Sequence, residues 1–105
     1  MANQAVGMVE VFGLVTAFAA CDAGCKAADV TVERFDKNKP ANADKLPVPL
    51  LVVVKFRGTV DSVNAAVDAA IEAANRVSGV VSHYVIANVE DDTEKMLKIH
   101  GFDKN

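Results

Sequence analysis

The chain has 105 residues, 51% of them hydrophobic, which predicts a single domain spanning 1–105. Its formal net charge of −3, with no basic cluster, argues against nucleic-acid binding. No apolar run reaches the ~18–20 residues that span a bilayer, and the first ten residues lack a signal peptide's charged and apolar regions, so we expect a cytoplasmic protein with no membrane contact.

The first half of the chain predicts a strand, a helix and a second strand. Valines dominate residues 5–11, and residues 30–35 alternate apolar with polar side chains, as strands do. Between them, Asp22 precedes Lys26 by four residues, the favourable order for an ion pair on a helix. Steps of three and four predict an apolar helix face formed by Leu14, Ala17, Phe18, Cys21, Cys25 and Ala28.

A long connection follows the second predicted strand. Residues 36–49 exceed the usual connection of about 4–6 residues, and they hold all three prolines of the chain. Acidic and basic side chains alternate along the segment. A loop of this length in a small domain is either idle or functional.

The second half predicts a central strand, a strongly periodic helix, a fourth strand and a short last helix. Residues 50–56 begin as a continuous apolar run, which favours a buried central strand. Thr59 is placed to cap a helix over 59–77, and Gly79 is placed to end it. Residues 80–89 suit a strand, and about 90–100 suit a helix whose acidic residues come first.

This order, β-α-β-β-α-β plus a terminal helix, predicts an α+β, ferredoxin-like domain with a four-stranded, mostly antiparallel sheet. The fold hosts many functions, so the element order cannot name one.

The residues themselves offer little chemistry. Cys21 and Cys25 could bind a metal, but a structural zinc site needs four ligands, so we expect buried, inert thiols. His83 lies in a predicted strand without an acid beside it, and His100 follows the last helix. The acidic run at 91–95 is explained more simply as a helix start than as a metal site. We therefore predict no catalytic residue, no metal and no cofactor.

Two long blocks of the sequence carry a family resemblance. The first is "GMVEVFGLVTAFAACDAGCKAADV" (7–30), and the second is "FRGTVDSVNAAVDAAIEAANRVSGVVSHYVI" (56–86). Together the blocks resemble the single-domain, hexamer-forming shell proteins of bacterial microcompartments, known by their BMC domain. The likeness covers most of residues 5–87. It includes Gly7, Met8, Val9, Glu10, Gly13, Leu14, Ala20, Asp22, Lys26, Ala28 and Val30.

The resemblance implies a structural role. Members of this family form flat cyclic hexamers that assemble into the facets of a shell, which encloses enzymes and admits small metabolites through a pore on the hexamer axis. By family position, Lys26 would lie at the hexamer edge. The loop between the second and third strands surrounds the pore, which here implies Asp36, Lys37, Asn38, Lys39, Pro40, Asn42, Asp44 and Lys45.

Two departures from the family pattern stand out. The loop is longer than usual, lacks glycine and carries one net positive charge, which would favour anionic metabolites. It could plug the pore, extend it as a collar, or lie over one face without a gating role. In addition, residues 87–90 replace a Pro-Arg-Pro-His run that supports contacts between hexamers, so a hexamer is a safer prediction than flat tiling.

The leading hypothesis is a non-enzymatic shell subunit in the shell of a cytoplasmic microcompartment. Its partners would be copies of itself, other shell proteins and encapsulated enzymes. A ferredoxin-like regulatory module that binds a small ligand is the alternative. A small enzyme that uses His83 is the third hypothesis.

Overall fold

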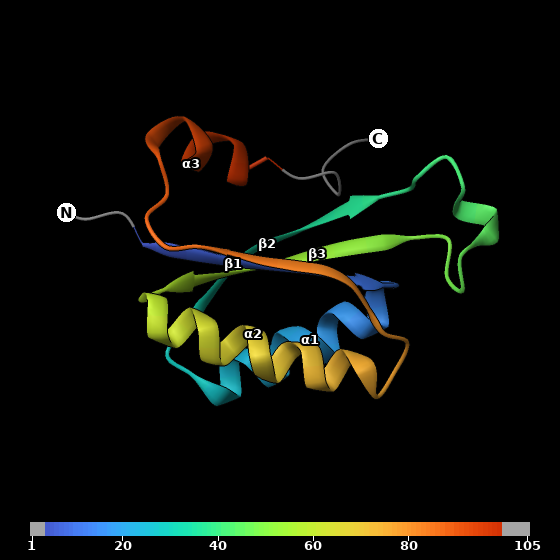
Figure 1. Cartoon of the computed structure of the whole chain (residues 1–105), viewed down its shortest axis with the longest axis horizontal. Coiled ribbons are helices and arrows are strands. Elements are labelled where there is room, and N and C mark those ends of the chain that lie inside the picture. The colour runs from blue at the N-terminus through green and yellow to red at the C-terminus, as the bar shows by residue number, and fades with distance from the viewer. Residues whose placement is uncertain (1–3, 100–105) are drawn as a thin grey trace.

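The computed structural model describes residues 4–99, and it has three layers (Figure 1). Two helices lie under one face of a sheet, and a short third helix lies over the other face. No helix in the described range is long and apolar enough to cross a membrane. The elements are β1 (Ala5–Phe12), α1 (Leu14–Ala27), β2 (Thr31–Asn38), the 3-10 turn η1 (Ala43–Lys45), β3 (Leu51–Gly58), α2 (Val60–Asn75), β4 (Val80–Ile86) and α3 (Asp91–Leu97).

The four strands form one antiparallel sheet in the order β2-β3-β1-β4. The predicted element order is confirmed, and so is the central position of the strand that begins near residue 50. The inner strands β1 and β3 pair along their whole length, from Ala5 with Gly58 to Phe12 with Leu51. The sheet therefore has two fully paired inner strands and edges at β2 and β4.

Helix α2 covers the sheet as its periodicity predicts. Val63 and Val67 are buried against the sheet core, and Thr59 caps the helix by accepting a hydrogen bond from the backbone N–H of Ser62 at 3.2 Å. Gly79 follows the helix with φ +111°, a conformation that favours glycine. The capped, valine-lined helix is thus built as the sequence indicated.

Helix α1 covers the sheet with only part of the predicted face. Ala17 is buried, and Cys21 and Ala28 pack partly against the core, whereas Leu14, Phe18 and Cys25 are exposed. Its buried residues are small: Thr16, Ala17, Ala20 and Gly24. Phe18 is 60% exposed, and Cys25 is also exposed. The physical reason is close approach, since a Cβ on Gly24 would lie 2.4 Å from the ring of Phe56 on β3. The prediction that Phe18 and Cys25 face the core is therefore wrong.

The long connection starts later than predicted. Asp36, Lys37 and Asn38 continue β2 and pair with Val53, Val52 and Leu51 of β3. An irregularity between Val32 and Phe35, where Arg34 has φ +94°, shifts the register before this extension. The loop predicted at 36–49 is therefore a connection over 39–50, because ladder pairing with the apolar run of β3 extends the strand.

Candidate functional site

The eight residues predicted to surround a pore all lie on one protrusion, which we call the hairpin arm (residues 36–50). Figure 1 shows the arm extending beyond the ends of the helices. Three of the eight are in β2, Lys39 and Pro40 begin the connection, Asn42 precedes η1, and Asp44 and Lys45 lie within η1. Because these residues are neighbours in the sequence, their proximity does not test the predicted pore, which stays a prediction.

The tip of the arm is a folded turn. The backbone N–H of Ala43 donates to the carbonyl oxygen of Pro40 at 3.0 Å, and that of Lys45 donates to Asn42 at 2.9 Å. Ala43 is only 4% exposed, although it lies far from the main core. At its base the arm is anchored where the Gly13 N–H donates to the Leu50 carbonyl at 2.8 Å. The arm therefore has internal order in spite of its length.

Strand alternation divides the charges at the base of the arm. Lys37 pairs with Val52, which belongs to the core under the helices, whereas Asp36 pairs with Val53 on the opposite face. Successive side chains of a strand point to opposite faces. A carboxylate and an ammonium group thus lie on the two sides of the same strand.

Lys26, the predicted edge residue, lies in the last turn of α1. Its side chain is 76% exposed, and its Nζ lies 2.7 Å from the Asp22 carboxylate. That hydrogen bond is the main reason why the pKa of Lys26 is raised. The predicted Asp22–Lys26 pair is confirmed, and it leaves the lysine stem exposed at the surface.

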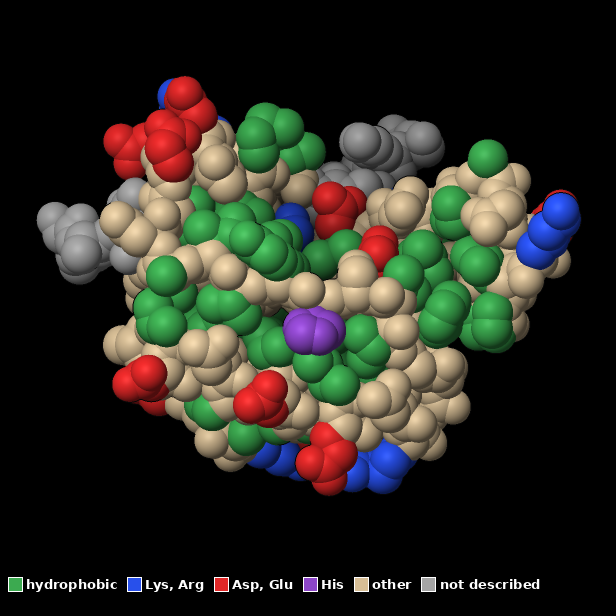
Figure 2. Space-filling view, viewed as in Figure 1, with side chains coloured by type: hydrophobic (Ala, Val, Ile, Leu, Met, Phe, Trp, Pro, Cys, Tyr) green, Lys and Arg blue, Asp and Glu red, His purple; other side chains and the backbone are tan. Residues whose placement is uncertain are grey.

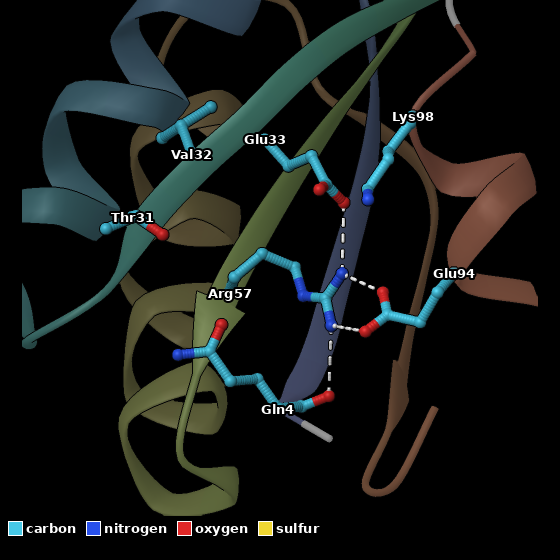
Figure 3. Close-up of a pocket in the computed structure, with 7 residues that line it drawn as sticks. All are labelled: Gln4, Thr31, Val32, Glu33, Arg57, Glu94 and Lys98. Atoms are coloured by element: carbon cyan, nitrogen blue, oxygen red, sulfur yellow. Dashed lines mark hydrogen bonds and ion pairs between the residues drawn. The ribbon is translucent and has the colours of Figure 1, made fainter. Parts of the chain in front are cut away.

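The other face of the sheet holds a cation that the sequence reasoning missed. Arg57 on β3 is 6% exposed, and it holds α3 through both oxygens of Glu94, with its Nη2 2.9 Å from Oε2 (Figure 3). It also donates to Glu33 at 3.0 Å and to the Gln4 and Ala5 carbonyls. These carboxylates, Glu94 first, raise the pKa of Arg57, and Arg57 in turn lowers the pKa of Glu94.

Lys55, two residues earlier on the same strand face, holds the end of α3. It is 4% exposed, and its Nζ donates to the carbonyl oxygens of Leu97 at 2.7 Å and Ile99 at 3.3 Å. Burial lowers the pKa of this lysine. A sequence signal existed: two cations spaced by two residues on one face of an apolar central strand require buried partners.

A polar pocket of about 330 Å³ surrounds this arginine. Figure 3 shows Glu33 on β2 and Glu94 on α3 pointing toward the guanidinium group, with Lys98, just after α3, beside them. Because the arginine is already held by two carboxylates and two carbonyls, the pocket serves to dock α3. It therefore gives little support to the alternative of a small-ligand module.

His83 lies exposed on the edge strand β4, opposite Val9. It borders a shallow groove of about 180 Å³ with Ser82, whose hydroxyl is 3.3 Å from Glu10. Adjacent strand residues point to opposite faces, so Ser82 and His83 do not form a nucleophile–base pair. Within residues 4–99 there is no group of three or more metal-ligand side chains placed to hold an ion, and His100 lies outside the described range.

Both cysteines are free thiols. Cys21 is partly buried against the core, and burial is the main reason why its pKa rises to about 11, with further contributions from Cys25 and Asp22. Cys25 is exposed and Cys21 is only partly buried. The prediction of two buried thiols is therefore wrong for Cys25 and only partly correct for Cys21.

Residues 87–90, which the resemblance implies replace a Pro-Arg-Pro-His run, connect β4 to α3. Val89 is fully buried beside Val6 and Leu97. Glu90 caps α3 by accepting hydrogen bonds from the N–H groups of Asp92 and Thr93. This segment is therefore used to seat the last helix, which runs over 91–97 rather than the predicted 90–100.

Comparison with known proteins gives a consistent result. Residues 5–89 match the family model of the BMC domain. The chain is 37% identical over 97 residues to the carboxysome shell protein CcmK2 of Synechococcus elongatus, an alignment that covers 90% of this chain and 86% of that protein. It is 38% identical over 97 residues to the bacterial microcompartment shell protein PduA of Salmonella typhimurium, covering 92% and 94%.

A solved structure shares the fold. A microcompartment protein from Desulfitobacterium hafniense superposes with a TM-score of 0.70 at 24% identity. The match covers 95% of this chain and 49% of the other, so this chain spans about half of that protein's length.

Proposed function

The chain belongs to the BMC domain family, and from that premise we propose that it is a structural shell subunit of a bacterial microcompartment, assembled as a cyclic homohexamer. The observation that carries this proposal is the near-complete alignment with shell proteins, which covers about nine-tenths of both chains in the case of PduA. The names of these relatives are those of structural proteins, which agrees with the prediction that the chain is not an enzyme. Such a shell lies in the cytoplasm.

Exposed apolar residues on two different flanks support a ring. The α1 flank consists of Leu14, Val15 and Phe18, with Phe18 5.0 Å from the ring of Phe35 on the edge strand β2. The β4 flank consists of Val81 and Tyr84 on the opposite edge strand. Figure 2 shows hydrophobic side chains spread along the face that includes β4. When two unlike patches join, the contact is heterologous and generates a closed ring if the rotation closes.

The hairpin arm is the proposed lining of a central pore. Its residues 36–45 hold three lysines and two aspartates, and copies around an axis would give a net positive mouth that favours anionic metabolites. The folded tip and the ladder that continues to Asn38 support a collar rather than a flexible loop.

Lys26 is the proposed contact between neighbouring hexamers. Its exposed stem can lie along an apolar neighbour while the ammonium group stays in water. Other shell proteins and encapsulated enzymes are the further proposed partners. Because residues 87–90 are occupied with seating α3, we assign the contact between hexamers to Lys26 and not to this segment.

Native mass spectrometry of the full chain tests the assembly. We expect a species of about six times the 11.1 kDa of one chain. Phe18→Ser on the α1 flank and Tyr84→Ser on the β4 flank should each shift the population to smaller species while the fold is retained. Asp68→Ser, on the exposed side of α2, is the matched control and should leave the hexamer intact. A monomer at high concentration in the wild type would refute the proposal.

A further inference from the structure

Two thiols lie one turn apart on the surface of α1. Cys21 and Cys25 are four residues apart on a continuous helix, which sets their Cβ atoms about 5–6 Å apart on one side. Cys25 also helps to raise the pKa of Cys21, as expected for two thiols that are neighbours on one side of a helix. Cys25 is open to solvent, whereas Cys21 packs partly against the core. One thiol of the pair is therefore accessible to solvent, and the other is partly shielded from it.

The helix keeps this pair from oxidising to a disulfide. A disulfide requires Cβ atoms about 3.5–4.5 Å apart, which is less than the helical spacing of about 5–6 Å. Closing the bond would break α1, which is packed through Ala17, Ala20 and Gly24 against the rest of the core. As long as the helix is folded, both thiols stay available as ligands.

We propose that Cys21 and Cys25 form a two-sulfur binding site for a soft monovalent or divalent d10 cation that accepts linear coordination, such as Cu(I), Ag(I) or Hg(II). If the metal–sulfur bonds are about as long as the zinc–sulfur bond of about 2.3 Å, two opposed sulfurs lie roughly 4.6 Å apart. This distance is within reach of two rotatable side chains whose Cβ atoms lie about 5–6 Å apart. The proposal does not rest on the shell function, but Cys25 follows Phe18 by seven residues on the same side of α1, so it requires that the contact made by the α1 flank leaves Cys25 accessible.

The ligand set selects this class of ion. Thiolates prefer soft metals, and tetrahedral zinc needs four ligands, whereas no group of three or more metal-ligand side chains occurs in the described part of the chain. Binding exchanges two S–H bonds for two S–metal bonds and releases two protons to the buffer. The oxidation states of sulfur and metal do not change. Cys25 provides the entry point, and the partial burial of Cys21 shields the bound ion from water.

The test is a titration of the reduced full chain with Cu(I) under nitrogen, against a chromogenic Cu(I) chelator of known affinity. We expect one ion per chain, release of two protons per ion, and a sulfur-to-metal absorption band. Cys21→Ser and Cys25→Ser should each weaken binding by about 100-fold or more, because the second sulfur no longer binds intramolecularly.

A relocated thiol gives the matched control. The double variant Cys25→Ala/Ala27→Cys keeps two thiols, but residue 27 is exposed and lies about 240° around the helix from Cys21. Circular dichroism and native mass should match those of the wild type, while Cu(I) affinity falls as in the single variants. Equal affinity in the relocated variant would overturn the proposal, and so would a stoichiometry of one ion per two chains, which indicates a bridge between subunits.

Discussion

The two faces of the sheet are covered in different ways. The face toward α1 and α2 is sealed by small and branched apolar residues, including a glycine that lets Phe56 approach α1 closely. The face toward α3 is sealed by two buried cations, Lys55 and Arg57, which bind the carbonyl end and a carboxylate of a seven-residue helix. The first face depends on close packing and the second on charge-assisted hydrogen bonds. Substitutions on the two faces should therefore affect stability in different ways.

The difference shows that the sheet with α1 and α2 forms the main packed unit, and that α3 is attached to it by fewer apolar contacts. The apolar contribution of α3 and its approach is mainly Val89 and Leu97, so polar contacts carry much of its docking. Errors on the helix-covered face should lower the global free energy of unfolding. Substitutions on the α3 face should first cause local unfolding of α3. The exception is a substitution that leaves buried charges without partners, which should also lower global stability.

The largest effect is expected from Arg57→Ala. It would leave Glu94, Glu33 and two backbone carbonyls without their donor. Removing one partner of a fully buried ion pair costs about 3–5 kcal/mol, and since the Glu33 and Glu94 side chains are 20% and 25% exposed, we expect a loss at the lower end, about 3 kcal/mol. Urea unfolding measures the loss. Arg76→Ala is the control, since the Arg76–Glu72 pair is exposed and worth about 0.3–0.5 kcal/mol. Similar losses for both variants would contradict the buried-network account.

Gly24→Ala tests the shape-dependent face and should rank second. In an ordinary helix interior this change stabilises by about 1 kcal/mol. Here the new Cβ would lie 2.4 Å from Phe56, and overpacking costs about 1–3 kcal/mol. The same urea measurement decides the sign. Adding Phe56→Leu should recover part of the loss, and a stabilised single variant would refute the close-approach argument.

Lys55→Met should have a smaller and more local effect. The replacement fills similar space without a buried charge, but the carbonyls of Leu97 and Ile99 lose their donor. We expect hydrogen exchange to speed up in residues 91–97, with a change of about 1 kcal/mol or less in global stability. Lys95→Met, on the exposed side of α3, is the control. Unchanged exchange in α3 would show that Lys55 does not hold the helix.

The smallest effect expected is a pH dependence from Glu94. The Arg57 hydrogen bond lowers the pKa of this carboxyl below 4.5 in the folded chain. Its contribution to stability is therefore fully present above pH 4.5 and is lost as the pH falls through the lowered folded-state value. Glu94→Gln should flatten that part of the curve of unfolding free energy against pH. If Glu94→Gln leaves the slope of unfolding free energy against pH unchanged at acid pH, the pH dependence comes from other carboxylates.

Local pattern predicted most of the elements. Periodicity identified α2, its Thr59 cap and the glycine after it, and the apolar run near residue 50 identified a central strand. The arm residues were predicted as one group because they are contiguous in sequence. These features depend on near neighbours, which a sequence displays directly.

What the sequence alone determined is the order of the elements, the family and the charged segment between β2 and β3. Only the tertiary structure decided which face of α1 is buried, where β2 ends and why β3 carries Lys55 and Arg57. The buried side of α1 depends on the room left by Phe56, and the length of β2 depends on a partner strand. The two cations depend on a helix that begins more than thirty residues later in the chain, and contacts between such distant residues leave no periodic signal along the chain.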